Sequence, residues 1–163
     1  MAKQTINQRD FRDALGRFAT GVTVITTQTS SGQPIGLTAN SFSSLSLDPA
    51  MILWSLAKDT PNVKEFLECK HFAVNILSAN QQNLSDQFSK PIGDRFVSVD
   101  WQKGVNGAPL IGSCLAYFEC CNRVCYDGGD HHIFVGSVEH FQFSDGQPLI
   151  FYDGHYCIVT DVE

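Results

Sequence analysis

Positive charge is sparse in this sequence. Its 163 residues include 11 Lys and Arg against 17 Asp and Glu, which gives a formal net charge of −6. The basic residues are scattered along the chain, whereas a protein that binds nucleic acid needs a basic face toward the phosphates. We therefore expect no nucleic-acid partner.

Long apolar runs are also missing. No stretch reaches the roughly 18 consecutive apolar residues that a membrane-spanning helix needs, and residues 1–10 lack the apolar core of a secretion signal. The chain has the length of one domain, with 43% hydrophobic and 17% charged residues. We expect a single domain over residues 1–163, located in the cytoplasm and without a membrane partner.

The six cysteines contain no C-x-x-C pair. Cys120 and Cys121 are adjacent, so they point to opposite faces of a strand, while Cys121 and Cys125 share a face but lie roughly 13 Å apart. His132 and His140 also share a face, yet a straight strand would separate them by roughly 26 Å. These spacings predict reduced, mostly buried thiols and no metal site.

Several catalytic signatures are absent from the sequence. It has no G-x-S-x-G elbow of a serine hydrolase, no G-x-G-x-x-G fingerprint of a Rossmann fold and no phosphate-binding P-loop. A dinucleotide ligand would therefore have to be held in some other way.

What the sequence does contain is a series of candidate strands separated by turn signals such as 30–33 and 48–49. The predicted strands are 22–27, 34–39, 42–47, 51–56, 72–77, 115–126, 131–143, 149–152 and 156–160. So many strands with so few helices favour a mainly β fold, a closed antiparallel β-barrel with a few short helices.

Three helices are predicted around these strands. Asn7 can cap the first, which ends near Gly21 and places Phe11, Leu15 and Phe18 on one apolar face. The second begins with Thr60 as N-cap and Pro61 at the first helical position. The third begins with Ser78 and Gln81 in capping-box spacing, and its Leu84 and Phe88 point inward.

A run of small polar residues, 36–46, stands out in a chain otherwise rich in large apolar side chains. On a strand through Thr38 to Ser43, alternation would place Thr38 and Asn40 on one face and Ala39, Ser41 and Ser43 on the other. Such a surface leaves room for a flat polar ligand against the backbone. The alternative is an exposed polar edge strand.

The segment 55–62 is the best candidate for a phosphate site. Ser55, Lys58 and Thr60 stand before the predicted helix start, where free N–H groups carry partial positive charge. The alternative is ordinary helix capping with a solvated lysine. Asn75 interrupts an apolar strand, and it either satisfies a neighbouring backbone group or contacts the ligand.

His131 and His132 begin a strand just after the Gly128–Gly129 turn. An imidazole at this place can reach over a neighbouring face, and the alternative is a histidine exposed to water in a turn.

These stretches together resemble the flavin reductase-like domain family. The pieces that carry the resemblance are Phe18–Thr27, Gly36–Ser46, Leu47–Pro49, Phe72–Leu77, Asp94–Phe96, Gly107–Leu110, Glu119–Cys120, Gly129–Gly136, Pro148–Tyr152 and Gly154–Tyr156. The resemblance implies an FMN-binding split β-barrel with Greek-key antiparallel topology, usually a homodimer with flavin sites near the subunit interface.

The resemblance also implies which residues meet the ligands. The expected flavin contacts are Thr38, Ala39, Asn40, Ser41, Ser43, Ser55, Lys58, Thr60 and Asn75. The histidine that matches His131 contacts the nicotinamide nucleotide, with a positional role, because hydride transfer needs alignment more than a proton relay. No residue is predicted to act as a catalytic acid or base.

The function implied is an NAD(P)H-dependent flavin oxidoreductase, a flavin reductase. NADH or NADPH would pass a hydride to N5 of FMN, or of FAD, and the reduced flavin would then leave, with a monooxygenase as one recipient. Two alternatives stay open: a flavoprotein whose tightly bound FMN reduces another acceptor, and a flavin-binding module without turnover.

Overall fold

The computed structural model describes residues 6–91 and 93–160 and is mainly β. Its strands are β1 Thr20–Gly21, β2 Thr23–Gln28, β3 Pro34–Ala39, β4 Ser43–Leu47, β5 Ala50–Ala57, β6 His71–Ile76, β7 Trp101–Lys103, β8 Pro109–Ile111, β9 Ala116–Gly128, β10 His131–Phe143, β11 Ile150–Tyr152 and β12 His155–Cys157. Its helices are α1 Gln8–Leu15, α2 Val63–Glu68, α3 Gln82–Ser89 and the 3-10 turn η1 Ala79–Gln81.

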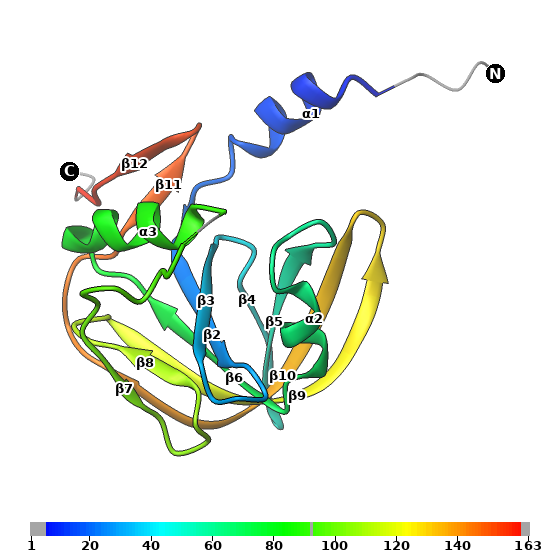
Figure 1. The fold of residues 1–163 in the computed structure, drawn as a ribbon. Helices are drawn as coiled ribbons and strands as arrows, with labels where there is room; N and C mark the ends of the chain where they lie inside the picture. Colours follow the sequence, from blue (N-terminus) through cyan, green and yellow to red (C-terminus); the bar gives the residue numbers. More distant parts are fainter. Residues whose placement is uncertain (1–5, 92, 161–163) are drawn as a thin grey trace.

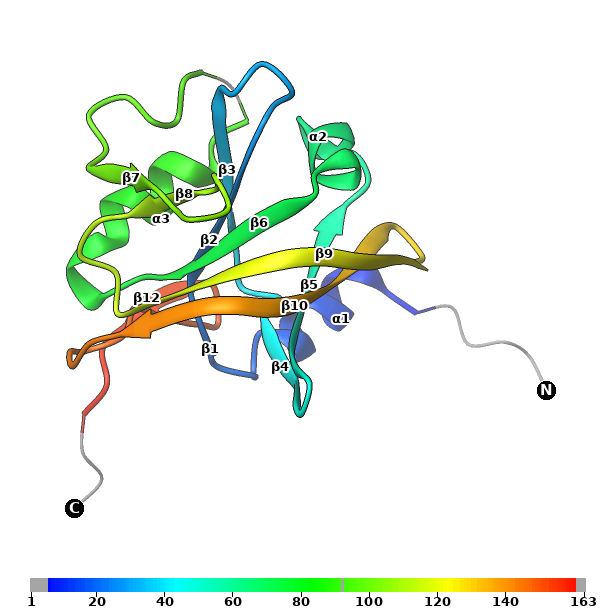
Figure 2. The same ribbon diagram turned by 90° about the horizontal axis from the view of Figure 1, so that it is seen from below.

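Seven of these strands form one curved sheet in the order β3-β2-β6-β9-β10-β5-β4. Neighbouring strands are antiparallel throughout, and β9 and β10 make a long hairpin that spans the molecule (Figures 1 and 2). The prediction of a mainly β, antiparallel fold is confirmed. Within the described residues, β3 and β4 are the two edge strands of this sheet, and no hydrogen-bonded pairing between them closes it into a barrel.

Two smaller sheets flank the large one. One has the order β1-β11-β12, and the other pairs β7 with β8 and packs Ala108 and Leu110 against Ala73 of β6. Strands β1, β7 and β8 are not among the predicted strands, and their two or three residues are too few to display alternation.

Aromatic side chains fill the main core between the strands. Trp54 of β5 stacks on Phe134 of β10 with ring centroids 4.5 Å apart, while Phe66 and Phe72 meet the indole edge-on. All four side chains are almost fully buried. This packing fixes β5 against β10 and so sets the position of the strand ends that border the site.

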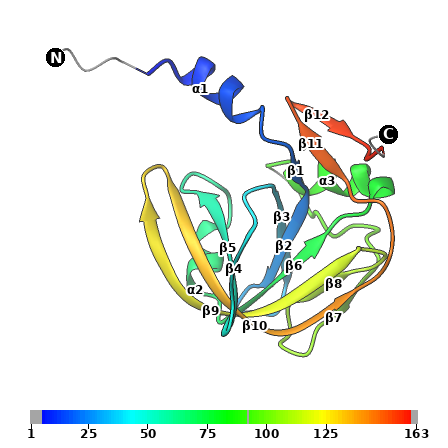
Figure 3. The same cartoon turned by 180° about the vertical axis from the view of Figure 1, so that it is seen from behind.

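Helix α1 begins as predicted, because the Asn7 side chain accepts hydrogen bonds from the backbone N–H groups of Arg9 and Asp10. It ends at Leu15 and not near Gly21, and it projects away from the sheet (Figure 3). Its apolar face does not pack in this chain: Phe11 is 54% exposed, Leu15 60% and the following Phe18 78%. None of the described helices combines the length and apolarity of a membrane-spanning segment.

The other two helix predictions have different outcomes. The capping box of Ser78 and Gln81 is present, and Phe88 of α3 is buried as expected. The predicted start at Thr60 and Pro61 is wrong, since α2 begins at Val63. Asn62 has left-handed backbone angles (φ 64°), which a right-handed helix does not allow, so the preceding residues form turns.

Candidate functional site

Most of the predicted ligand contacts line one cavity of about 430 Å³. The cavity lies where the end of β3, the end of β5 and the start of β10 meet, beside the C-terminal end of α3. The predicted residues that line it are Thr38, Ala39, Asn40, Ser41, Ser55, Thr60 and His131. Residues far apart in the sequence are thus brought together at one place.

The link between β3 and β4 shapes one wall of this cavity. The predicted continuous strand through Thr38 to Ser43 is wrong, because β3 ends at Ala39 and residues 40–42 are irregular. The Ser41 hydroxyl donates to the Ser55 carbonyl at 2.8 Å and accepts from the Ser55 N–H at 2.9 Å. This side chain takes the place of a backbone partner and ties the link to β5.

The cavity offers polar groups on short side chains beside apolar ones. In residues 6–91 and 93–160, no hydrogen-bond partner is found for the side chains of Asn40, Ser55 and Thr60. Leu37 and Phe88 supply apolar surface nearby. The volume lies in the usual range of small-molecule sites, roughly 300–1,000 Å³, and the donor set suits a flat ligand with carbonyl and ring-nitrogen acceptors. The residues present therefore fit a flavin.

Arg95 is the one Lys or Arg among the residues that line the cavity. Its guanidinium donates to the Gly36 carbonyl at 2.7 Å, and burial lowers its pKa from the ordinary value. An arginine stays charged in proteins, so this side chain provides a cation for a phosphate group. Arg95 is not among the predicted contacts, although Asp94–Phe96 is one of the segments that carry the family resemblance.

Lys58, by contrast, does not line the cavity. It forms an ion pair with Asp127 of β9, which holds the pKa of that carboxyl below its usual value. The backbone N–H of Lys58 bonds to the Asp130 carbonyl, so the residue joins the end of β5 to the β9–β10 hairpin. With α2 starting later and only six residues long, the predicted anion site at a helix start loses its basis.

Two further predicted contacts lie outside the cavity. Ser43 is exposed on β4, and its hydroxyl bonds to the neighbouring Ser44 carbonyl. Asn75 is fully buried; its amide donates to the Val24 carbonyl and the Thr26 hydroxyl and accepts from the Ile111 N–H. For Asn75 the structure favours the alternative in which it satisfies neighbouring groups.

His131 is among the residues that line the cavity, and it is paired with Ala57 of β5. Its Nδ1 lies 2.6 Å from the Asp130 carboxylate, and this hydrogen bond holds the pKa of Asp130 below its usual value. The bond fixes the ring while 45% of the side chain stays exposed. His132 lies opposite Leu56 and contacts Phe134 edge-on, away from the cavity lining.

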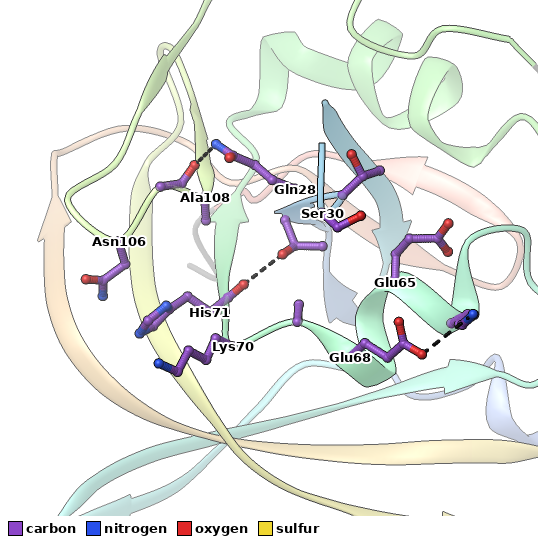
Figure 4. A pocket seen from close by; sticks show the side chains of 13 residues that line it. Gln28, Ser30, Glu65, Glu68, Lys70, His71, Asn106 and Ala108 are labelled. Carbon is purple, nitrogen blue, oxygen red and sulfur yellow. Dashed lines mark hydrogen bonds and ion pairs between the residues drawn. The ribbon is translucent and has the colours of Figure 1, made fainter. Parts of the chain in front are cut away.

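A second cavity, of about 500 Å³, is larger but contains none of the predicted contacts (Figure 4). Charged and polar side chains such as Gln28, Glu68 and His71 line it. The larger volume would favour this cavity as the ligand site. The smaller cavity is the better candidate, because predicted polar contacts from separate segments of the chain line it together.

Comparison with known proteins gives a family match over most of the chain. Residues 15–160 match the family described as "Flavin reductase like domain". The chain is 47% identical to the "FMN reductase (NADH) SmoA" of Agrobacterium fabrum, covering 92% of this chain and 85% of that protein. It is 45% identical to the reductase component of a flavin-dependent trigonelline monooxygenase from Acinetobacter baylyi, covering 91% of this chain but 48% of that protein.

Among solved structures, the NADH:FAD oxidoreductase of Streptomyces globisporus, in complex with NAD and FAD fragments, superposes with a TM-score of 0.89. The two are 35% identical, over 97% of this chain and 98% of that one. The chain spans about half the length of some of the curated relatives that it matches.

Proposed function

Because the chain belongs to the flavin reductase like domain family, we propose that it is an NADH-dependent flavin reductase. The observation that carries the proposal is the cavity at the end of β3, which Asn40, Ser55 and Thr60 line together with Arg95 and His131. Such a site suits two ligands stacked face to face, with the flavin inside and the nicotinamide over it.

Each group has a distinct task in this proposal. The side chains of Asn40, Ser55 and Thr60 donate to the flavin ring and ribityl chain, and Arg95 neutralises the phosphate. Bound flavin supplies an electron sink at N5 for a hydride from the nicotinamide. His131, held by Asp130, positions the nicotinamide nucleotide and moves no proton.

The proposed cofactor is FMN with NADH as donor, and FAD is the second candidate. The name of the Agrobacterium relative supports FMN and NADH, and that of a Streptomyces relative, "NADH-dependent FAD reductase", supports FAD. The printed role of the Acinetobacter relative as a reductase component supports a separate monooxygenase as recipient of the reduced flavin.

The assembly and location are also part of the proposal. One domain spans residues 1–163 and pairs with a second copy, supported by large apolar side chains left on the surface, such as Phe18, Leu47 and Phe143. A cytoplasmic location is supported by the six cysteines, which are all free thiols.

The experiment is steady-state oxidation of NADH by the purified protein, with and without added FMN. A colourless protein that oxidises NADH only when flavin is supplied fits the diffusible-flavin reductase. A yellow protein that turns over only with a different acceptor supports the tightly bound alternative. Flavin binding without any NADH oxidation would contradict an enzymatic role.

A further inference from the structure

Three potential metal ligands lie close together on the large sheet, outside the smaller cavity that is the proposed flavin site (the flavin cavity). They are His71 of β6, Cys121 of β9 and Glu139 of β10, and their ligand atoms all lie within 4.8 Å of one another. His71 is directly opposite Cys121 in the β6–β9 ladder, and its Nε2 is 3.7 Å from the Glu139 carboxylate. None of the three lines the flavin cavity.

A β-bulge brings Glu139 to this cluster. The pairing of β10 with β9 shifts register between Val138 and His140, so Glu139 is the extra residue that has no partner in the ladder. A bulge of this kind turns a side chain away from the regular alternation and often lies next to a functional site.

The surroundings of the cluster favour a cation. Asn106 donates from its side chain to Glu139 and from its backbone N–H to Glu119, whose carboxylate is almost fully buried. Within the described part of the chain, neither carboxylate forms an ion pair with a Lys or Arg. Asn106 and His71 also line the larger cavity (Figure 4), through which an ion and water would reach the cluster.

We propose that His71, Cys121 and Glu139 bind Zn²⁺, with water as the fourth ligand. Imidazole, thiolate and carboxylate together suit zinc, whereas a thiolate is a poor ligand for Mg²⁺ or Ca²⁺. Tetrahedral zinc places its ligand atoms roughly 3.3 to 3.8 Å apart, which the His71–Glu139 pair already satisfies. The Cys121 sulfur, which lies within 4.8 Å of the other two ligand atoms, would have to approach them by about 1 Å at most to reach the same range.

Binding would join three neighbouring strands through their side chains. The Cys121 thiol gives its proton to solvent as the Zn–S bond forms, so the affinity rises with pH. The Asn106 amide, which donates to the Glu139 carboxylate, would be an outer-sphere residue that orients this ligand.

The test is titration of the metal-free protein with Co²⁺, followed by displacement with Zn²⁺. We expect one ion per chain, a thiolate-to-cobalt charge-transfer band, and loss of that band when Zn²⁺ is added. The band should vanish in Cys121→Ser, and the affinity should fall at least about tenfold in His71→Ala and about tenfold in Asn106→Ala.

Two matched variants serve as controls. Cys125→Ser on β9 and His140→Ala on β10 remove a thiol and an imidazole that lie outside the cluster, and both variants should bind Co²⁺ as the parent does. Should Cys121→Ser fail to fold, Glu139→Gln, at a partly exposed position, tests the same site. Absence of stoichiometric binding, or a band that survives Cys121→Ser, would overturn the proposal. No readout depends on flavin or NADH, so failure here leaves the proposed function untouched.

Discussion

His131 lines the smaller cavity, the proposed flavin site, and Asp130 holds its ring through Nδ1. If the ring positions the nicotinamide, His131→Ala should raise KM for NADH about tenfold, or about 1.4 kcal/mol, through one lost hydrogen bond and stacking contact. FMN affinity should stay nearly unchanged, and the hydride step should gain no pH dependence. Stopped-flow reduction of bound flavin at several NADH concentrations measures these effects.

The neighbouring His132 provides the control for this measurement. It packs against Phe134 and does not line the cavity, so His132→Ala should leave KM for NADH unchanged. A His131→Ala protein that loses flavin but binds NADH normally would reverse the assignment of the two ligands.

Arg95 is the candidate partner of the flavin phosphate. Arg95→Gln should weaken FMN binding by about 1 to 3 kcal/mol and weaken binding of riboflavin, which lacks the phosphate, far less. Lys58→Gln should change neither affinity much, because that lysine is paired with Asp127. Fluorescence titration with both ligands decides; equal losses for FMN and riboflavin in Arg95→Gln would place the phosphate elsewhere.

At the scale of the elements, Asn75 holds three strands together. Its amide satisfies Val24 and Thr26 of β2 and Ile111 of β8 from a fully buried position on β6. Asn75→Ala should lower the free energy of unfolding by about 2 to 4 kcal/mol, since buried polar groups lose their partners. FMN affinity of the folded fraction should be retained, whereas the exposed Ser43→Ala should change neither quantity. Chemical denaturation and flavin titration test the two statements, and a stable Asn75→Ala protein without flavin affinity would restore Asn75 as a ligand contact.

The elements also show what the sequence could and could not predict. Strands β3 and β10 begin and end where their residue patterns indicated, because flanking turns and apolar side chains mark both. The irregular path of residues 40–42 and its attachment to β5 could not be predicted from the local pattern, since they depend on the contact of Ser41 with a distant strand. The same holds for the start of α2, where the left-handed backbone of Asn62 replaces the expected first turn.

The candidate sites also differ in how far the sequence could predict them. Small polar residues and a histidine after a glycine turn indicated most of the predicted contacts that line the smaller cavity, since short polar side chains are unusual in an apolar chain. Arg95 was not singled out, and the cluster of His71, Cys121 and Glu139 comes from three strands and a bulge. Spacing along one segment cannot reveal contacts that only the strand order creates.

At the scale of the whole molecule, the apolar face of α1 has no buried residue in this chain. We expect sedimentation at micromolar concentration to give a dimer, because a second copy would cover this face. The double change Phe11→Ser and Leu15→Ser should weaken the dimer at least about tenfold, through the loss of buried apolar area. Arg12→Ser, on the same helix, should leave it intact, and a parent protein that is monomeric with full activity would contradict the paired assembly.

The central claim is that the cavity at the ends of β3 and β5 holds the flavin, and filling each cavity in turn tests it most directly. Ala57→Trp places an indole in the smaller cavity, and Ser30→Trp places one in the larger cavity (Figure 4). The measurement is the FMN dissociation constant of both variants by fluorescence titration, with circular dichroism to verify folding. The account predicts that Ala57→Trp weakens FMN binding at least about a hundredfold, or about 2.7 kcal/mol. Ser30→Trp should leave the FMN dissociation constant unchanged. Unchanged FMN binding by a folded Ala57→Trp protein would contradict it.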